Sequence, residues 1–392
     1  MSTPSRPLGR RLRLGMVGGG EGAFIGAVHR IAARMDDRYE LVAGALSSDP
    51  DRSRASAEAL SLNPDRAYAD FKEMARAESA RDDGIDVVSI VTPNHLHHAA
   101  AGTFLEAGIH VICDKPLTTT LDHALDLVRL VRDSKLVFGL THNYCGYPLV
   151  RQARAMVQAG KLGEIRVIQA EYPQEWLTTR LEDTGQKQAE WRTDPVRSGA
   201  GGCIGDIGTH AYNLGGFISG LEATELCADL STFVPGRRLD DNAHVLLRYE
   251  NGARAMLWSS QVAPGNENAL RVRVYGEKGG LEWSQEQPNM LRFAPFGEPP
   301  RTITRGGYGS DEIAAHATRI PSGHPEGYLE AFANLYRDLA EQITAHIQGR
   351  DPDPLAQQCP TVEDGARGVK FIETAVESSA RGGVWLGLVL GL

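Results

Sequence analysis

Short apolar runs alternate with amphipathic stretches over the first part of the chain. The apolar runs lie at 12–17, 39–45, 87–91, 110–113 and 137–140. Between them, the spacing of apolar residues predicts helices at 23–35, 51–60, 70–80, 96–107 and 121–134. Apolar runs without polar alternation are typical of parallel strands, which are buried on both faces of a sheet. The alternation therefore predicts successive βαβ units and a Rossmann-type α/β domain at 12–145.

The pattern changes after about residue 150. A predicted helix at 149–159 is followed by strand-like runs at 165–172, 225–232, 243–249, 253–261, 270–276 and 279–284. Most connections between these runs are too short for a crossover helix, so this sheet should be mainly antiparallel. A long loop is predicted at 302–325, and two helices follow at 326–348 and 362–380. Residues 146–392 are therefore expected to form an α+β domain that includes the C-terminal helices.

Composition and charge exclude several classes of protein. Of the 392 residues, 42% are hydrophobic and 23% are charged, as in ordinary globular proteins. The net charge of −9 provides no basic field for nucleic acid. No apolar run approaches the roughly 20 residues that a membrane-spanning helix needs. The apolar ending at 384–392 is too short for that and is expected to pack on a partner or on the core.

The cysteines and the N-terminus favour a cytoplasmic location. The five cysteines are odd in number and scattered, which is typical of reduced thiols. Residues 1–11 are basic and contain an arginine pair, as twin-arginine export signals do. Because no apolar signal core follows, we expect a disordered basic leader instead.

A glycine-rich loop follows the first predicted strand and opens the first predicted helix. Gly18, Gly20 and Ala23 fit the pattern G-x-G-x-x-(G/A) in the strand–turn–helix setting that dinucleotide sites require. Small residues let the backbone approach a pyrophosphate, which is then held by the first amides of the helix. We expect Gly18, Gly20, Ala23, Phe24 and Ile25 to bind NAD or NADP.

The residues after the second strand bear on which nucleotide is used. NAD enzymes usually have an acid there, which binds the ribose 2′-hydroxyl. Here Ser47 and Ser48 follow the strand, so a 2′-phosphate would meet hydroxyls, and Arg52 is within reach of it. This slightly favours NADP. Asp49 as the acid would instead favour NAD, and Ser48 or Asp49 as a helix cap would leave the choice open.

Two further loops end predicted parallel strands, where ligands bind in open α/β sheets. The first contains Thr92, Pro93 and Asn94 and leads to His97, and we expect these residues to lie at the nicotinamide. The nearby histidines lack the cysteine or acid partners of a metal site, so no metal is expected. The second loop is Asp114-Lys115-Pro116, which can direct the lysine ammonium into a cleft. The alternative is a surface lysine before a loop-starting proline.

A glycine-rich segment in the second half leads to Asp206 and His210. Their spacing of four places both on one face of a helix. A carboxylate and an imidazole together can transfer protons near neutral pH. Taken alone, such a pair more often has a structural explanation, with Asp206 as a helix cap and His210 as a core residue.

Together, the four motifs resemble those of the Gfo/Idh/MocA oxidoreductase family. The motifs are Gly18-x-Gly20, Thr92-Pro93-Asn94, Asp114-Lys115-Pro116 and Gly201-Gly202-x-x-x-Asp206-x-Gly208-x-His210. The resemblance implies an open-faced sheet in the second domain, which serves as the contact of a homodimer or homotetramer. It also implies NAD(P)-dependent oxidation of a secondary hydroxyl in a sugar, sugar derivative or polyol. Asp114 departs from the family, which more often has glutamate there.

Carried over by motif position, Lys115, Asp206 and His210 form the catalytic group. His210 is expected to act as the base, oriented by Asp206, while Lys115 stabilises the reacting oxygen or itself accepts the proton. The residues expected at the substrate are Lys115, Asn143, Tyr144, Tyr172, Trp176, Trp191, Arg192, Asp206, His210 and His324. Two other functions fit the same motifs. One is a redox-neutral glycoside hydrolase or epimerase that oxidises a ring hydroxyl transiently, and the other is a non-catalytic dinucleotide sensor.

Overall fold

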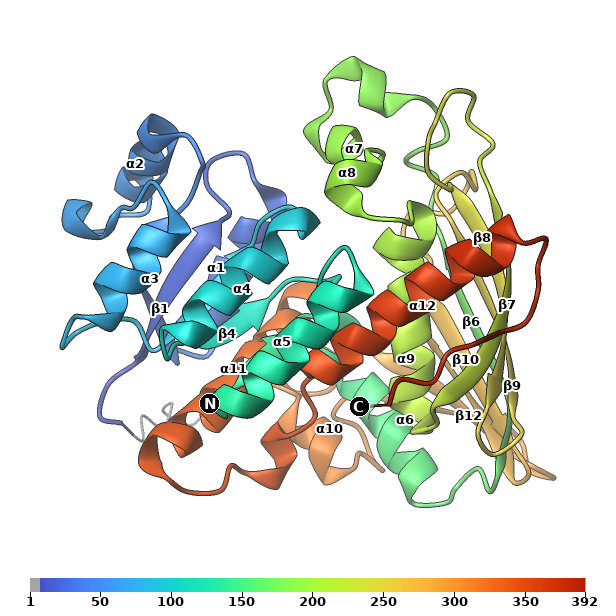
Figure 1. The fold of residues 1–392 in the computed structure, drawn as a ribbon. Coiled ribbons are helices and arrows are strands. Elements are labelled where there is room, and N and C mark those ends of the chain that lie inside the picture. The colour runs from blue at the N-terminus through green and yellow to red at the C-terminus, as the bar shows by residue number, and fades with distance from the viewer. Residues whose placement is uncertain (1–7, 392) are drawn as a thin grey trace. The chain divides into compact units, whose positions relative to one another are not determined.

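The computed structural model describes residues 8–391 and divides the chain into two compact units (Figure 1). The first unit contains the residues up to Thr118, together with Asp122–Gly146 and Tyr328–Ala366. The second unit contains Thr119–Leu121, Tyr147–Gly327 and the residues from Arg367 onward. The chain therefore leaves the first unit near the expected boundary but returns to it later.

The first unit is built on a parallel sheet with the strand order β2-β1-β3-β4-β5. The predicted α/β Rossmann architecture is confirmed, since each apolar run forms a strand and each amphipathic stretch forms a helix. The strands are β1 Leu12–Gly18, β2 Tyr39–Ala45, β3 Val87–Val91, β4 His110–Cys113 and β5 Phe138–Leu140. The helices between them are α1 Phe24–Met35, α2 Pro50–Ala59, α3 Phe71–Ser79, α4 His97–Glu106 and α5 Leu121–Ser134. Every residue of β3 and β4 is buried, as parallel strands covered on both faces require.

Helix α11 (Tyr328–Gln348) belongs to the first unit, although we expected it in the second domain. Its apolar residues, including Phe332 and Leu339, share one core cluster with Leu12 and Leu14 of β1. The hydroxyl of Tyr39 also donates a hydrogen bond of 2.8 Å to a main-chain oxygen of α11. The apolar periodicity of the sequence predicts this helix but carries no information about which sheet it covers.

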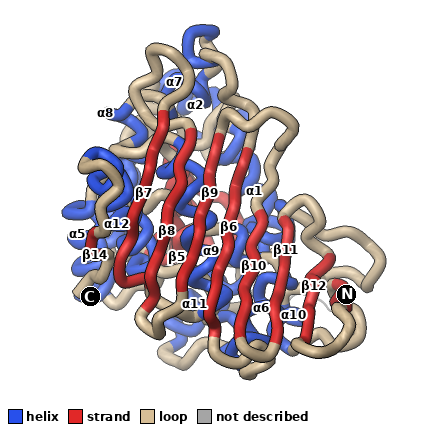
Figure 2. The backbone as a smooth tube through the Cα atoms, turned by 90° about the vertical axis from the view of Figure 1, so that its right-hand side faces the viewer, coloured by secondary structure: helices blue, strands red, loops and turns tan. Residues whose placement is uncertain are grey.

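The second unit is built on a sheet with the strand order β13-β12-β11-β10-β6-β9-β8-β7-β14, and Figure 2 shows most of these strands side by side. The strands are β6 Ile165–Pro173, β7 Ala223–Ser231, β8 Asn242–Tyr249, β9 Arg254–Ser260, β10 Arg271–Gly276, β11 Gly279–Ser284, β12 Met290–Pro295, β13 Arg301–Thr304 and β14 Leu386–Gly387. The helices in or entering this unit are α6 Pro148–Gln158, α7 Lys187–Arg192, α8 Pro195–Ser198, α9 Thr209–Ser219, α10 Glu312–His316 and α12 Val362–Ala380. Neighbouring strands are antiparallel except for β6 and β9, so the expected mainly antiparallel sheet is confirmed.

The prediction of a long loop at 302–325 is wrong, because this segment contains most of β13 and all of α10. Strand β13 pairs with β12 through its backbone at the edge of the sheet, and most of its side chains are exposed. An exposed edge strand needs no apolar alternation, so the sequence shows no signal for it. Helix α10 is too short to show a helical period.

One face of the second sheet is packed and the other is open. Along β6 and β8, buried residues alternate with exposed ones, as the two-residue period of a strand requires. Apolar side chains also reach the open face, among them Val167, Leu246, Met256 and Tyr275, which are 41–53% exposed. Helix α9 packs on the opposite face.

The two ends of the chain are tied to their own units where they are described. Residues 1–7 of the expected leader, and residue 392, lie outside the described residues. Arg10, which we expected to be disordered, instead binds Asp86 with two hydrogen bonds of 2.6 and 2.8 Å. At the other end, β14 pairs with β7, and Trp385 lies 3.9 Å from the guanidinium carbon of Arg248. Nowhere in residues 8–391 is a helix both long enough and apolar enough to cross a membrane.

Candidate functional site

The glycine loop of the first unit has a backbone that only small residues can form. Gly18, the last residue of β1, and Gly19 have φ angles of +78° and +72°, which residues other than glycine rarely adopt. A Cβ atom on Gly20 would lie 2.7 Å from the carbonyl oxygen of Leu46 and 2.8 Å from Oγ of Ser56. The loop therefore presses against the end of β2, and glycine is required for that close approach.

The loop delivers the chain to α1 with amides that suit a pyrophosphate. The N-cap residue Ala23 makes no side-chain cap hydrogen bond, so it leaves the first amides of the helix to other acceptors. Those amides and the helix dipole favour a bound anion. Phe24 lies in the first turn and is 66% exposed. Arg30, which the motif did not predict, donates a hydrogen bond of 2.5 Å to the oxygen of Gly19 and thereby holds the loop.

At the end of β2, Asp49 acts as a helix cap. Its Oδ1 accepts hydrogen bonds from the amides of Asp51 and Arg52, at 2.9 and 3.0 Å. Ser47 is half-buried, and its hydroxyl accepts a hydrogen bond of 3.2 Å from the amide of Asp49. Of the two residues expected as possible caps, Asp49 caps α2. Ser47 and the exposed Ser48 follow the end of β2.

His97 connects the loop after β3 to the loop after β4. Its imidazole is buried, with Nε2 at 2.9 Å from the oxygen of Thr92 and Nδ1 at 2.8 Å from the oxygen of Pro116. Burial lowers the pKa of His97. Both ring nitrogens therefore face the backbone of the two loops, and the residue shapes the site by holding them. His98 lies elsewhere, stacked on His123 with ring centroids 4.1 Å apart.

Asp114 and Lys115 follow β4 in a loop that is fixed by its own carboxylate. Oδ1 of Asp114 accepts hydrogen bonds from the amide of Lys115 and from the hydroxyl of Thr141, both at 2.9 Å. The peptide bond between Lys115 and Pro116 is cis. The short aspartate in this position therefore reaches its own loop, and the lysine side chain is half-buried.

Polar groups gather at the carboxyl ends of β3 and β5. Asn143 and Tyr144 are buried just after β5. Burial, followed by the charge of Lys115, lowers the pKa of His142 to about 3, so this imidazole is neutral. Within the described residues, Oγ1 of Thr92 and Nδ2 of Asn143 are buried without a hydrogen-bond partner. Buried polar atoms left in this state suit a polar ligand, so the residues present fit a dinucleotide.

In the second unit, Asp206 and His210 lie on one continuous helix. A π-helical turn (Ile204–Gly208) leads into α9, with the amide of Thr209 donating to the oxygen of Ile204. Such turns are frequent at functional sites. Four residues along a helix separate the carboxylate from the imidazole, as the sequence predicted. His210 is 7% exposed, and its ring centroid lies 6.2 Å from that of Tyr172.

Asp206 does not cap this helix, because its carboxylate binds two side chains from other segments. Nε2 of Gln261 donates to Oδ2 at 2.9 Å, and Nε of Arg192 lies 3.3 Å from the same oxygen. The guanidinium of Arg192 in turn stacks on Trp191, 4.3 Å from the ring centroid. Gln261 was not predicted, since nothing in its local sequence marks it.

The remaining substrate candidates divide into two groups. The hydroxyl of Tyr172 donates a hydrogen bond of 2.7 Å to Oδ1 of Asn268, and Trp176 joins the same polar network through a neighbouring glutamine. Tyr172 and Arg192 are therefore near His210 and Asp206, respectively. His324 is exposed in the loop before α11, and its backbone oxygen accepts a hydrogen bond from Arg305. The contacts of His324 thus hold a surface loop.

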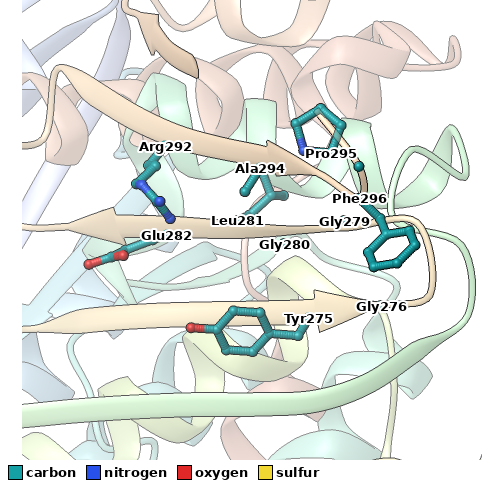
Figure 3. A pocket seen from close by; sticks show the side chains of 11 residues that line it. Tyr275, Gly276, Gly279, Gly280, Leu281, Glu282, Arg292, Ala294, Pro295 and Phe296 are labelled. Atoms are coloured by element: carbon teal, nitrogen blue, oxygen red, sulfur yellow. The ribbon is translucent and has the colours of Figure 1, made fainter. Parts of the chain in front are cut away.

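A hollow of about 310 Å³ lies on the open face of the second sheet, between β10, β11 and β12 (Figure 3). Its lining includes Tyr275, Glu282, Arg292 and Phe296, and Figure 3 shows these side chains above the strands. None of the predicted site residues lines it. The hollow is therefore separate from the candidate site.

Comparison with known proteins covers almost the whole chain. Residues 12–142 match the model of an oxidoreductase family with an NAD-binding Rossmann fold, and residues 150–282 match the GFO/IDH/MocA C-terminal domain. The chain is 35% identical to the uncharacterized oxidoreductase YfiI of Bacillus subtilis (strain 168), over 98% of this chain and 99% of YfiI.

Solved structures show the same relationship. The crystal structure of an oxidoreductase from Sinorhizobium meliloti is 56% identical, with a TM-score of 0.88 over 96% of this chain and 99% of that one. An inositol dehydrogenase homolog from Azotobacter vinelandii, complexed with NADH and myo-inositol, is 37% identical, with a TM-score of 0.91 over 98% of this chain and 100% of that one. The predicted fold and the NAD(P) cofactor are confirmed. The chain therefore belongs to the Gfo/Idh/MocA family of NAD(P)-dependent oxidoreductases.

Proposed function

We propose that this oxidoreductase acts on a CH–OH donor and oxidises a secondary hydroxyl of a sugar, sugar derivative or polyol. The observation that carries the proposal is the pair of Asp206 and His210 on one helix, with Asp206 anchored by Gln261 and Arg192. Related proteins support the substrate class. The Azotobacter vinelandii relative was solved with myo-inositol, and a relative 28% identical over 73% of this chain is named levoglucosan dehydrogenase.

Bound NAD(P) supplies the hydride acceptor. In the proposal, the loop from Gly18 to Ala23 holds the pyrophosphate, and Thr92 and Asn94 contact the nicotinamide side. The expected slight preference for NADP rests on Ser47 and on the exposed Arg52. The NAD+ and NADH complexes of the Azotobacter vinelandii protein weigh against that preference. We infer that NAD is the working cofactor and that Ser47 permits NADP.

The side chains divide the proton chemistry between them. His210 takes the proton of the substrate hydroxyl, and the carboxylate of Asp206 supports the imidazolium charge that results. The ammonium of Lys115 donates a hydrogen bond to the same oxygen and stabilises its developing negative charge. Tyr172, beside the His210 ring, offers an aromatic surface and a polar network to a sugar or polyol. We assign Asn143, Tyr144, Trp176 and Trp191 to substrate contacts as well.

We also propose that the open face of the second sheet forms a homodimer or homotetramer contact. Its exposed apolar residues, including Leu246 and Met256, support this assignment. Light scattering on the purified protein, with Met256→Glu as the disrupting variant, measures the oligomeric state.

The activity is tested by incubating the enzyme with NAD+ or NADP+ and a panel of sugars, sugar acids, polyols and glycosides. We expect net formation of reduced nicotinamide with at least one free sugar or polyol. Cleavage or epimerisation without net reduction would overturn net oxidation and identify the redox-neutral reaction. Binding of nucleotide without turnover of any substrate, in wild type and variants alike, would indicate a non-catalytic sensor.

A further inference from the structure

The helix that carries Asp206 and His210 is capped from a distant segment. Its own N-cap residue, Cys203, makes no side-chain cap hydrogen bond. Instead, Oδ1 and Oδ2 of Asp240 accept hydrogen bonds from the amides of Gly202 and Ile204, at 2.6 and 2.7 Å. The backbone oxygen of Asp240 accepts a third, at 2.8 Å, from the amide of Cys203. One residue therefore binds three successive amides at the start of this helix.

The chain accommodates Asp240 by bringing two backbones unusually close together. A Cβ atom on Gly202 would lie 2.3 Å from the backbone oxygen of Asp240 and 2.8 Å from Cβ of Leu239. The glycine-rich approach to the helix thus has a physical reason, since only glycine permits this contact. Gly202 also starts the turn that holds the acid, because its oxygen accepts a hydrogen bond of 2.9 Å from the amide of Asp206.

Burial makes this cap costly to maintain. Asp240 is 9% exposed, and burial raises its pKa to about 6, while the amides of Ile204 and Gly202 act in the opposite direction. A buried carboxylate is retained when its hydrogen bonds compensate for lost hydration. Here those hydrogen bonds end on the first turn of the helix with Asp206 and His210, and a negative charge at that end also suits the helix dipole.

We propose that Asp240 is a positioning residue for the reaction. Its carboxylate fixes the first turn of the helix, so that Asp206 stays against Gln261 and Arg192 and His210 keeps its place one turn further on. The proposal rests on the proposed function of Asp206 and His210. Asp240 itself takes no part in proton transfer.

The chain offers a matched control in the next residue. Asp241 is also buried, and it accepts hydrogen bonds from the amides of Phe233 and Val234, at 2.9 and 3.0 Å, and from Arg237. Its side chain therefore holds a loop, whereas that of Asp240 holds the catalytic helix. Asp240→Asn and Asp241→Asn each convert one buried carboxylate into an amide of the same shape.

The test compares kcat, both KM values and amide hydrogen exchange in the two variants. In Asp240→Asn we expect kcat to fall by about thirtyfold or more, nucleotide KM to stay within twofold, and exchange to quicken in the 202–210 segment. In Asp241→Asn we expect a similar loss of melting temperature, a kcat within threefold of wild type, and faster exchange at 233–234. If Asp240→Asn does not fold, Asp240→Ser replaces it, because the serine hydroxyl can still accept one amide hydrogen bond. We expect the same changes in kcat, nucleotide KM and hydrogen exchange for this variant.

Two results would overturn the proposal. One is a kcat for Asp240→Asn within threefold of wild type, and the other is an equal loss of kcat in both variants, which would reduce Asp240 to a structural role. Failure of the role proposed for His210 is distinguishable, because it would appear as full activity in His210→Ala. The exchange data report on the cap independently of activity.

Discussion

The two units hold their site residues in different ways. In the first unit, the support comes from the motifs themselves. Asp114 binds the amide of Lys115, and His97 joins the two loops that flank the expected nicotinamide position. In the second unit, Asp206 and His210 are held by distant segments, through Gln261, Arg192 and Asp240. A motif in the first unit thus contains much of its own scaffold, whereas the motif in the second unit depends on side chains from outside it.

The units also differ in the buried groups that titrate. The first unit buries neutral histidines, and burial lowers the pKa of His29 and His110 to about 4 and that of His142 to about 3. The second unit buries Asp240, whose pKa burial raises to about 6. The cause is the same in both units, because burial disfavours whichever form is charged. As the pH is lowered, the buried histidines therefore decrease the free energy of unfolding, whereas Asp240 increases it.

The largest expected effect comes from removing one reacting group in each unit. His210→Ala and Lys115→Ala should each lower kcat/KM by about a thousandfold, within the range of ~10²–10⁴ known for general acid–base groups. Steady-state kinetics measures the loss, with His98→Ala as a control, because the half-buried His98 stacks on His123 instead of facing the site. If Lys115→Ala is inactive while His210→Ala keeps wild-type activity, the base lies in the first unit. Wild-type activity in both would refute the catalytic assignment.

A smaller effect is expected from overfilling the glycine loop of the first unit. Gly20→Ala places a Cβ atom against the backbone oxygen of Leu46 and should raise the nucleotide KM by about tenfold to a hundredfold, as an overpacking cost of ~1–3 kcal/mol implies. The substrate KM should change little, because none of the residues assigned to the substrate lies in this loop. The control is Gly102→Ala, where the added Cβ meets only Leu130 at 3.6 Å. Unchanged nucleotide binding in Gly20→Ala would contradict the role given to the loop.

A still smaller effect should separate the two nucleotides. Ser47→Asp adds a carboxylate where a 2′-phosphate would lie, and like charges repel. We expect kcat/KM for NADP to fall by about tenfold relative to the value for NAD, which serves as the internal reference. An equal change for both nucleotides would mean that Ser47 does not face the adenosine ribose.

The smallest effect is the pH dependence of stability. Between pH 6.5, the ordinary pKa of histidine, and about 4, the unfolded chain binds more protons at His29 and His110 than the native protein does. The free energy of unfolding should therefore fall as the pH is lowered through this range. The amide of Val137 donates to Nδ1 of His110, so protonation there would break a hydrogen bond of 2.9 Å. Urea unfolding at several pH values measures this dependence. In His110→Gln, the free energy of unfolding should fall less steeply as the pH is lowered than it does in wild type.

Asp240 should act in the opposite direction. Its pKa is about 6 in the native protein against an ordinary value of 3.8, so the native protein binds more protons between these values. Its contribution to stability should therefore decrease as the pH rises through that range. Asp240→Asn removes this term, and the acid-induced loss of stability should then be steeper than in wild type. A shallower loss would contradict the opposite signs assigned to the two units.

Local sequence patterns predicted most of the helices and strands, because the spacing of apolar residues within one element depends only on the geometry of that element. Continuous apolar runs and helical spacing placed the strands and helices of the first unit within a few residues. Strand-like runs placed β6 to β11 equally well. Strand β12 was not predicted, although its first four residues alternate between exposed and buried. The signal also failed for β13, which is an exposed edge strand, and for β14, which has two residues. It also failed to assign α11 to the correct unit. An apolar helix face indicates that the helix packs against something, but it does not indicate which sheet or helix that is.

Sequence alone determined the family motifs and the positions of the apolar runs that form the strands. It also determined the spacing that puts Asp206 and His210 on one helix face. These depend on neighbours along the chain, whose geometry the backbone sets. Only the tertiary structure decided that Asp240 caps the helix from more than thirty residues away, and that Gln261 binds Asp206. Such contacts join segments that are distant in sequence, so they leave no local periodicity. They form only when burial and backbone hydrogen bonding bring the segments together.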